Sequence, residues 1–394
     1  MNLIVLSHMY PYEGKPYSGI FVQEQLKAVR KLLDGKIYVI SPVPWAPRIL
    51  WFRDKWKQYG MASRTSSEEG YKVMRPRYLN VPGARSLHIN SYFMYLSVRK
   101  TLTDILKEIG RENTLLHSHT ILPDGLAGAR AAKRFGLKSL CTLHGSDINV
   151  YPHRSRSIYK HSELGLTMND SCIAVSGVIK ERALKISSGA RIDVITNGVD
   201  TDMFRSGRRG MTHDKRQIVF VGKLVESKGV KELLRAFERI RGKHRDTQLM
   251  LIGEPEMKEW VSEYVHRNGL VGAVEMTGVV KHDALPEYYG KGHIFVLPSY
   301  SEGMPVSMFE AMAMRLPVVV SAVGGVPEII RHGENGLLIK PRSVDDIVDK
   351  VSMLLDNPAL ADRIAETALR EIRDKYTWDI SARKLVEKYN RLMS

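Results

Sequence analysis

The stretch HIFVLPSYSEGMPVSMFEAMA, residues 293–313, predicts how the second half of this 394-residue chain folds. An apolar run of strand length comes first, a loop containing Gly303 and Pro305 follows, and an apolar helix pattern begins at 306. Proline suits the first helical turn, because an amide there would have no partner within the helix. The stretch therefore indicates a strand–loop–helix unit of the kind that builds a helix-covered parallel sheet.

The same alternation of strands and helices extends along nearly the whole chain. Several predicted strands are continuously apolar, as expected for strands whose two faces are both covered by helices. The predicted strands are 3–8, 36–43, 71–79, 114–119, 138–144, 171–176, 191–196, 217–222, 247–252, 273–277, 293–297, 317–321 and 336–339. The predicted helices are 20–33, 91–109, 123–135, 177–188, 228–242, 256–268, 306–314 and 343–356.

The length of the chain fits two domains of similar size. A polar, glycine-rich stretch over 198–214 is predicted to link them, so we expect an N-terminal domain over 1–204 and a C-terminal domain over 205–377. The last segment, 358–394, is predicted to be helical, and its final helix, 378–394, is predicted to cross back onto the first domain. The fold class is α/β, with two Rossmann-like, doubly wound domains facing each other across a cleft.

The overall composition of the chain constrains its cellular location and its binding partners. The net charge of +16 favours polyanionic partners such as nucleotide diphosphates, anionic lipid or nucleic acid. No apolar run reaches the roughly 18 residues of a membrane span, and the first residues lack the basic region of a signal peptide. Two cysteines, Cys141 and Cys172, form no CxxC pair. We therefore expect a cytoplasmic protein.

Two carboxylates occur around the loop of the opening stretch. Glu302 lies in the loop, and Glu310 lies about one turn into the helix. The backbone amides of Gly303 and Met304 are expected at the helix start, where an anion is favoured; Pro305 has no amide to offer. Carboxylates accept hydrogen bonds from sugar or ribose hydroxyls. The pattern favours a ligand site over the alternative that Glu310 only caps or solvates a helix.

A second motif, GKLVESKG over 222–229, follows the first predicted strand of the second domain. Lys223 and Lys228 lie on either side of a turn that opens a helix. Two such lysines can neutralise a departing diphosphate, and a donor fixed on a developing anion lowers a barrier by roughly 2.7–4 kcal/mol. The alternative is a pair of surface lysines on a basic protein.

Two further motifs end strands of the first domain. The segment TLHGSD, residues 142–147, places His144 at the expected crevice. In the loop after the first strand, Gly19 opens a helix and lets a phosphate or an acceptor approach the backbone. His117 and His119 have the spacing of metal ligands on a strand, but no third ligand is near in sequence, so no metal is expected.

Two other motifs, a metal-binding D-x-D and a dinucleotide-binding fingerprint, are not supported by the sequence. Asp200 and Asp202 resemble a metal-binding D-x-D motif, but their position in the predicted linker indicates an interdomain turn. The loop after the first strand is not GxGxxG, and no acidic residue ends the second strand in the dinucleotide pattern. A nicotinamide-dependent oxidoreductase is therefore disfavoured.

In their order and spacing, these motifs resemble the retaining glycosyltransferases of sequence family four, which have the GT-B fold. The resemblance covers nearly the whole chain. It is carried by Gly19, the segments 144–147, 197–200 and 222–229, and the pair Glu302 and Glu310. It implies that Glu310 binds the ribose hydroxyls of the donor, and that Glu302 holds the donor sugar together with the amides of Gly303 and Met304.

The resemblance also implies roles for the remaining residues. Lys228 and Lys223 would bind the diphosphate, His144 would lie beside the reacting sugar, and Gly19 would approach the phosphate. The family usually carries arginine where this chain has Lys223, so a bidentate contact is lost while the charge is kept. The implied reaction retains anomeric configuration and requires neither metal nor cofactor. The leaving diphosphate would itself help to deprotonate the acceptor.

The expected reaction is transfer of a hexose-type sugar from a nucleoside-diphosphate sugar, with UDP as the expected nucleotide. Residues 10–25 resemble bacterial and archaeal members that build cell-surface polysaccharides, teichuronic-acid transferases among them. The acceptor is expected to be a glycan or a lipid-linked molecule in polysaccharide or glycolipid assembly.

Residues 45–59, WAPRILWFRDKWKQY, interleave aromatic and basic side chains. Such a segment can lie peripherally on an anionic membrane surface, here the inner face of the plasma membrane. The alternative is a helix packed on its own domain. The aromatic residues expected to insert are Trp51, Phe52 and Trp56, and the basic residues expected at the headgroups are Arg53, Lys55 and Lys57.

Two other functions remain open from the sequence. A GT-B nucleotide-sugar epimerase would share the donor site but would act without an acceptor. A basic nucleic-acid-binding protein would explain the charge, but no known reading module is present, so nucleic acid is not an expected partner.

Overall fold

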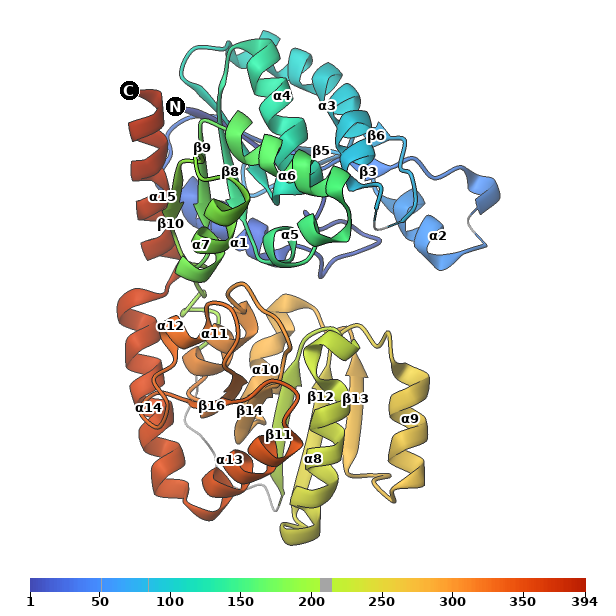
Figure 1. The fold of residues 1–394 in the computed structure, drawn as a ribbon, viewed down its shortest axis with the longest axis vertical. Coiled ribbons are helices and arrows are strands. Elements are labelled where there is room, and N and C mark those ends of the chain that lie inside the picture. The colour runs from blue at the N-terminus through green and yellow to red at the C-terminus, as the bar shows by residue number, and fades with distance from the viewer. Residues whose placement is uncertain (51, 84, 206–214) are drawn as a thin grey trace. The chain divides into compact units, whose positions relative to one another are not determined.

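The computed structural model describes residues 1–50, 52–83, 85–205 and 215–394. The chain divides into two compact units (Figure 1). The first contains Met1–Asn197 together with Trp378–Ser394, and the second contains Gly198–Thr377. Each unit is an α/β layer structure built on its own sheet.

The main sheet of the first unit has eight strands in the order β10-β9-β8-β7-β1-β2-β5-β4. All neighbouring strands are parallel except β4, which pairs antiparallel with β5 at the edge. Its strands are β1 (Asn2–Leu6), β2 (Ile37–Ile40), β4 (Thr65–Glu68), β5 (Tyr71–Met74), β7 (Thr114–His119), β8 (Lys138–Leu143), β9 (Ser171–Ala174) and β10 (Ile192–Val194). A separate two-stranded sheet pairs β3 (Val43–Pro44) with β6 (Arg77–Tyr78).

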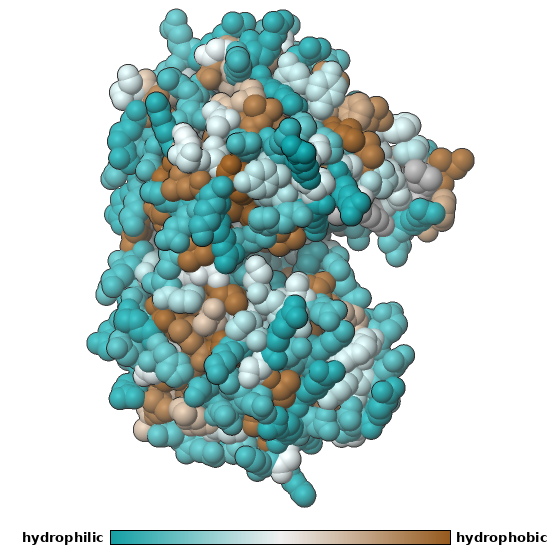
Figure 2. Space-filling view, in the orientation of Figure 1, coloured by the Kyte–Doolittle hydropathy of each residue, from teal (hydrophilic) through white to brown (hydrophobic). Residues whose placement is uncertain are grey.

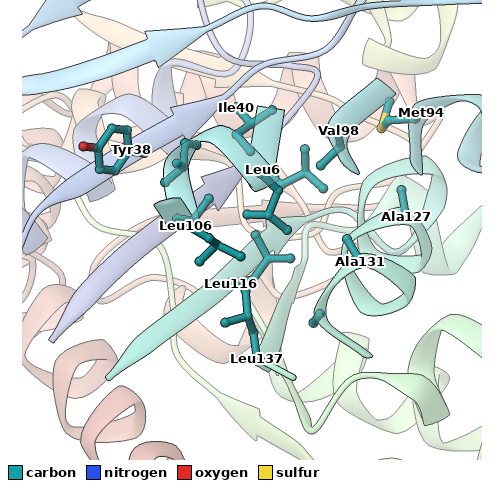
Figure 3. Close-up of a cluster of buried hydrophobic side chains, with 14 of the residues drawn as sticks. Leu6, Tyr38, Ile40, Met94, Val98, Leu106, Leu116, Ala127, Ala131 and Leu137 are labelled. Carbon is teal, nitrogen blue, oxygen red and sulfur yellow. The ribbon is translucent and has the colours of Figure 1, made fainter. Parts of the chain in front are cut away.

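Helices cover the sheet of the first unit. The helices are α1 (Ile20–Arg30), α2 (Asp54–Met61), α3 (Leu87–Ile109), α4 (Leu126–Phe135), α5 (Ser146–Asn149), α6 (Arg156–Met168), α7 (Gly177–Ile186) and α15 (Trp378–Met393). Figure 3 shows one core layer, in which Met94 and Val98 of α3 and Ala127 of α4 lie near Leu6 and Leu116 of the central strands. These side chains are fully shielded from solvent.

The second unit has a six-stranded, all-parallel sheet in the order β13-β12-β11-β14-β15-β16. Its strands are β11 (Arg216–Val221), β12 (Thr247–Ile252), β13 (Val274–Gly278), β14 (Ile294–Leu297), β15 (Val318–Ser321) and β16 (Leu337–Ile339). Its helices are α8 (Val230–Lys243), α9 (Lys258–Arg267), α10 (Leu285–Gly290), α11 (Val306–Ala313), α12 (Val326–Ile329), α13 (Val344–Asp356) and α14 (Pro358–Lys375).

The boundary between the units falls at Asn197–Gly198 rather than at the predicted 204–205. The reason is packing: Phe204 is buried against Tyr289 and His282 of the second unit, with ring centroids 5.9 and 5.3 Å away. Asp200 ends the preceding turn, because its Oδ1 accepts bonds from the amides of Asp202 and Met203 at 2.9 and 3.0 Å. The rest of the predicted linker, 206–214, lies outside the described residues.

Candidate active site

Three loops of the second unit follow neighbouring strands, and two of them carry the sequence motifs. Strand order reverses beside β11, since β12 lies on one side of it and β14 on the other. In an open parallel sheet, ligands bind at the carboxyl edge at such a switch point. The loops over 222–229, 298–305 and 322–325 follow β11, β14 and β15, so they meet at this edge.

Lys228 and Glu302 join the first two loops. The ammonium of Lys228 lies 2.6 Å from Oε1 of Glu302. Gly229 allows the approach: its φ is +71°, and a Cβ there would lie 2.1 Å from the carbonyl oxygen of Pro298. The amide of Tyr300 also donates to the carbonyl of Ser227 at 2.9 Å. Two residues predicted for the donor site are therefore in direct contact.

The backbone after Glu302 is fixed by the third loop. The amide of Gly325 donates to the carbonyl of Gly303 at 2.9 Å, and a Cβ on Gly324 would lie 1.9 Å from the carbonyl oxygen of Glu302. Met304 is buried, and Pro305 immediately precedes helix α11. The turn is thus held at the start of a helix, where backbone amides and the helix dipole favour an anion.

Glu310 is held from both sides by groups that sequence reasoning missed. Its Oε1 lies 3.0 Å from Nε2 of His282, and its Oε2 accepts a 2.8 Å bond from the hydroxyl of Tyr289. Glu310 is only 4% exposed. Burial, followed by the Glu310 charge, raises the pKa of Tyr289 well above its ordinary value, so the phenol remains a hydrogen-bond donor. His282 lies in the loop after strand β13, and this position after a strand is the one sequence feature that could have marked it as a candidate site residue.

Lys223 lies in a different environment from Lys228. Its ammonium is 2.7 Å from Oε2 of Glu254 and 3.3 Å from Oε1 of Glu256, two carboxylates that follow strand β12. Burial lowers the pKa of Lys223, but the two glutamates outweigh that effect and hold it above its ordinary value. Lys223 is therefore a charged ammonium that already has anionic partners, so a diphosphate would have to share it with them.

In the first unit, His144 is partly buried and lies at the end of a row of histidines whose other members, His117 and His119, are buried. Its Nε2 lies 3.0 Å from Nδ1 of His119, and the two rings stack with centroids 5.3 Å apart. The ring of His119 stacks in turn on His117 at 4.5 Å. His117 bonds to the hydroxyls of Tyr389 at 2.7 Å and Thr142 at 2.8 Å.

Burial keeps these histidines neutral. It lowers the pKa of His117 and of His144 to about 3, and it lowers that of His119 well below the ordinary value. A neutral imidazole has one donor and one acceptor nitrogen. His117 thus bonds to the C-terminal helix and to strand β8, while His119 bonds to His144.

Asp147 shapes the turn that carries His144. Its Oδ1 accepts bonds from the amides of His144 and Gly145 at 3.1 and 2.8 Å, and its Oδ2 accepts one from Ile121 at 3.0 Å. The φ of Gly145 is +131°, which few other residues adopt. Asp147 is therefore a buried structural residue of this motif.

Gly19 stands at the start of helix α1 with a φ of +61°. A Cβ there would lie 2.3 Å from the carbonyl oxygen of Met9, so only glycine fits. Two residues later, the ring of Phe21 packs on His144 with centroids 4.5 Å apart. The structure thus brings the two predicted site residues of the first unit into neighbouring segments.

The aromatic and basic segment over 45–59 contains both exposed and half-buried side chains. Phe52 is 75% exposed and lies under Arg53, while Trp56 is half-buried against Tyr59 with ring centroids 6.2 Å apart. Trp56 therefore packs on a residue of its own helix, and its insertion into a membrane stays a prediction. Lys57 is exposed. Trp51 and the side chain of Lys55 lie outside the described residues.

Within the described part of the chain, no helix is both long and apolar enough to span a membrane. The same residues contain no cluster of three or more His, Cys, Asp or Glu side chains placed to hold a metal ion.

Two Rossmann-like units in one chain are the architecture of the GT-B glycosyltransferases. The fold is also that of solved enzymes. The sucrose-phosphate synthase of Thermosynechococcus elongatus matches with a TM-score of 0.81 at 19% identity, covering 100% of this chain and 99% of that one. HepE of Anabaena, solved in complex with UDP, matches with a TM-score of 0.73 at 17% identity, covering 99% and 100%.

Sequence similarity identifies the family. Residues 205–371 match the profile of glycosyl transferases group 1, and residues 59–203 match that of Glycosyltransferase Family 4. The chain is 30% identical over 383 residues to TuaC of Bacillus subtilis, a glycosyltransferase assigned to teichuronic acid biosynthesis, covering 93% of each protein. The chain belongs to glycosyltransferase family 4.

Proposed function

We propose that this protein transfers a hexose from a nucleoside-diphosphate hexose, with UDP as the nucleotide, to a glycan or lipid-linked acceptor with retention of configuration. The observation that carries the proposal is the contact of Lys228 with Glu302 beside the helix that bears Glu310. This arrangement puts a cation, a carboxylate and backbone amides at one sheet edge, and a sugar attached to a diphosphate needs all three.

Each group of the second unit has a role in the proposal. Glu310 accepts hydrogen bonds from the ribose hydroxyls, since an ionised carboxylate can accept about four bonds and two are supplied by His282 and Tyr289. Glu302 accepts bonds from hydroxyls of the donor sugar. Lys228 neutralises the diphosphate, assisted by Lys223.

The proposed chemistry breaks the bond between the anomeric carbon and the diphosphate oxygen. The acceptor oxygen forms its bond on the same face, and its proton passes to the departing diphosphate. The protein stabilises the developing negative charge and positions the two sugars. No metal or cofactor takes part in this proposal, because two lysines and the amides of the turn supply the positive charge.

The cellular role proposed is cell-surface polysaccharide or glycolipid assembly on the cytoplasmic side of the plasma membrane. The similarity to TuaC supports the first part. The exposed apolar side chains of Ile49 and Phe52, beside Arg48 and Arg53, support peripheral contact with an anionic surface. Co-sedimentation with phosphatidylglycerol vesicles at low salt tests this contact. Failure of wild-type protein to sediment, or equal sedimentation of Phe52→Ser, would contradict it.

Thermal stabilisation by a panel of UDP, GDP, ADP, their hexose derivatives and NAD tests the donor. A ligand at 100 times its Kd adds about 2.7 kcal/mol of stability. We expect a shift with UDP and UDP-hexoses that Glu310→Gln abolishes and that the exposed control Glu263→Gln keeps. No shift with any nucleotide sugar would overturn the transferase proposal. Consumption of the donor without an acceptor, giving an epimerised sugar, would favour the epimerase.

A further inference from the structure

A cavity of about 430 Å³ lies in the first unit. It is lined by the loop after β1, by the segment after β6 and by part of α2. Strand order reverses at β1, which has β7 on one side and β2 on the other. The cavity therefore lies near the switch point of the first sheet, where parallel α/β sheets bind ligands.

A histidine–aspartate pair joins the two loops at this switch point. Nδ1 of His8, after β1, lies 2.7 Å from Oδ2 of Asp124, after β7, and the same oxygen accepts the His8 amide at 3.2 Å. Asp124 is fully buried, whereas the His8 side chain is 33% exposed and lines the cavity. The carboxylate fixes one ring nitrogen, so the orientation of the other nitrogen is fixed as well.

Two more polar groups line the same cavity. The hydroxyl of Tyr12, whose residue is 7% exposed, has no hydrogen-bond partner among the residues that the structure describes. Buried hydroxyls are normally satisfied, so this one points to a ligand. The ammonium of Lys15 lies over the ring of Tyr59 at 5.4 Å and close enough to His8 to depress its pKa.

The charge of the lining favours an anion. Among the described residues, the lining contains no aspartate or glutamate, and Lys15 is a permanent cation. Burial lowers the pKa of His8, but the charge and hydrogen bond of Asp124 outweigh that effect and hold it above the ordinary value. A phosphate fits this combination, because it accepts several charge-assisted hydrogen bonds.

One wall of the cavity is apolar and continues into an exposed apolar surface. Pro44 lines the cavity and is followed by Trp45, which is 54% exposed, while Ile49 is 82% exposed. Tyr59 of α2 forms part of the same wall. Figure 2 shows hydrophobic side chains at the tip of the protrusion that carries α2 in Figure 1. Apolar groups this exposed are typical of a binding surface.

We propose that this cavity is the acceptor site, and that the acceptor is a sugar phosphate attached to a lipid. Lys15, His8 and Tyr12 bind the sugar phosphate, and the exposed apolar side chains of Trp45, Ile49 and Phe52 carry the hydrocarbon chain. The inference rests on the proposed transferase function and narrows its acceptor from any glycan to a lipid-linked phosphate. In its neutral form His8 accepts a bond from an acceptor hydroxyl, and in its protonated form it donates to the phosphate.

Three matched probes test the phosphate and the hydrocarbon chain separately: octyl glucosyl phosphate, octyl glucoside and glucose 1-phosphate. The two octyl compounds are used below their micelle concentrations. Calorimetric titration of the full chain should give octyl glucosyl phosphate at least tenfold higher affinity than either of the others. Equal affinity for octyl glucoside would overturn the phosphate contact. Equal affinity for glucose 1-phosphate would overturn the lipid contact.

Variants locate the contacts. Lys15→Ala should lower the affinity for octyl glucosyl phosphate about tenfold, Tyr12→Phe should lower it severalfold, and Phe52→Ser should remove only the advantage of the octyl chain. The exposed controls Lys107→Ala and Leu164→Ser should change nothing. Equal effects of Lys15→Ala and Lys107→Ala would overturn the site.

UDP binding by the same proteins separates the two proposals. Its site is assigned to the second unit, so Lys15→Ala and Phe52→Ser should bind UDP as wild type does. Absence of UDP binding in wild-type protein would count against the transferase function itself. Normal UDP binding with no discrimination among the three probes would overturn the acceptor site alone.

Discussion

The ammonium of Lys228 lies 2.6 Å from Oε1 of Glu302, and this contact ties the loop after β11 to the loop after β14. The pair is partly buried, with 29% of the lysine side chain and 10% of the glutamate side chain exposed. An ammonium has three protons, so one bond to Glu302 fixes its position and leaves two for an anion. The pair is thus arranged to hold both the charged and the hydroxyl-bearing parts of a donor.

Removing the ammonium should slow the reaction more than it weakens donor binding. We expect Lys228→Met to lower kcat by about a hundredfold or more, because the lost donor acts on charge that develops in the transition state. Lys231→Met is the control, since Lys231 lies one turn away and pairs with the exposed Glu226 at 3.1 Å. Steady-state kinetics measure both. Equal losses of kcat in the two variants would contradict the assignment.

Tyr289 should matter for nucleotide binding through Glu310. Tyr289→Phe removes the 2.8 Å bond to Oε2 of Glu310 without changing the shape of the side chain. A hydrogen bond to a charged group contributes about 1.5–3 kcal/mol, so we expect UDP affinity to fall roughly tenfold and stability to fall by about that free energy. Calorimetry and urea unfolding give the two quantities. In the control Tyr264→Phe, which loses a bond to Glu238, UDP affinity should be unchanged.

Lys223 should tolerate arginine but not methionine. Arginine keeps the charge and adds a bidentate fork, so Lys223→Arg should bind UDP at least as tightly as wild type. Lys223→Met leaves Glu254 and Glu256 facing the site without their cation, and we expect UDP affinity to fall about tenfold. Isothermal titration measures both variants. Wild-type affinity in Lys223→Met would show that the glutamates, and not a diphosphate, are the partners of this lysine.

Acid should destabilise the fold through His117. Burial lowers its folded-state pKa to about 3, so below its ordinary value of 6.5 the unfolded chain takes up a proton that the folded chain does not. The free energy of unfolding therefore falls as the pH drops from 6.5 toward 3. One such histidine accounts for about 2 kcal/mol at pH 5.

Urea unfolding of His117→Gln between pH 7.5 and 5 measures this contribution. The variant should lose less stability across that range than wild type, even if it is less stable at pH 7.5. His266→Gln, on the exposed face of α9, should keep the wild-type slope. A variant slope equal to that of wild type would mean that His117 is protonated in the folded protein.

Chelation should leave the reaction intact. The proposed site neutralises the diphosphate with Lys228, Lys223 and backbone amides, so activity measured in EDTA should equal that of the untreated enzyme. Restoration by added Mg²⁺ or Mn²⁺ of activity that EDTA had removed would contradict the metal-independent proposal.

The sequence by itself determined the order of strands and helices and the loops that carry the site. Apolar runs and amphipathic periods are local properties, so the strand–loop–helix unit at 294–313 was readable without its neighbours. Local sequence patterns did not predict the elements whose apolar periodicity is weak. The helix Arg156–Met168 was not predicted, and the polar edge strand Thr65–Glu68 carries no apolar run.

Only the tertiary structure decided which side chains meet. His282 and Tyr289 hold Glu310 from 28 and 21 residues away, and His8 reaches Asp124 across 116 residues. No local pattern encodes such pairs, because they depend on how strands are ordered in a sheet and how closely glycines let loops approach. The sequence therefore determined the family and the motif positions, whereas packing around the two switch points decided the partners of each charged group.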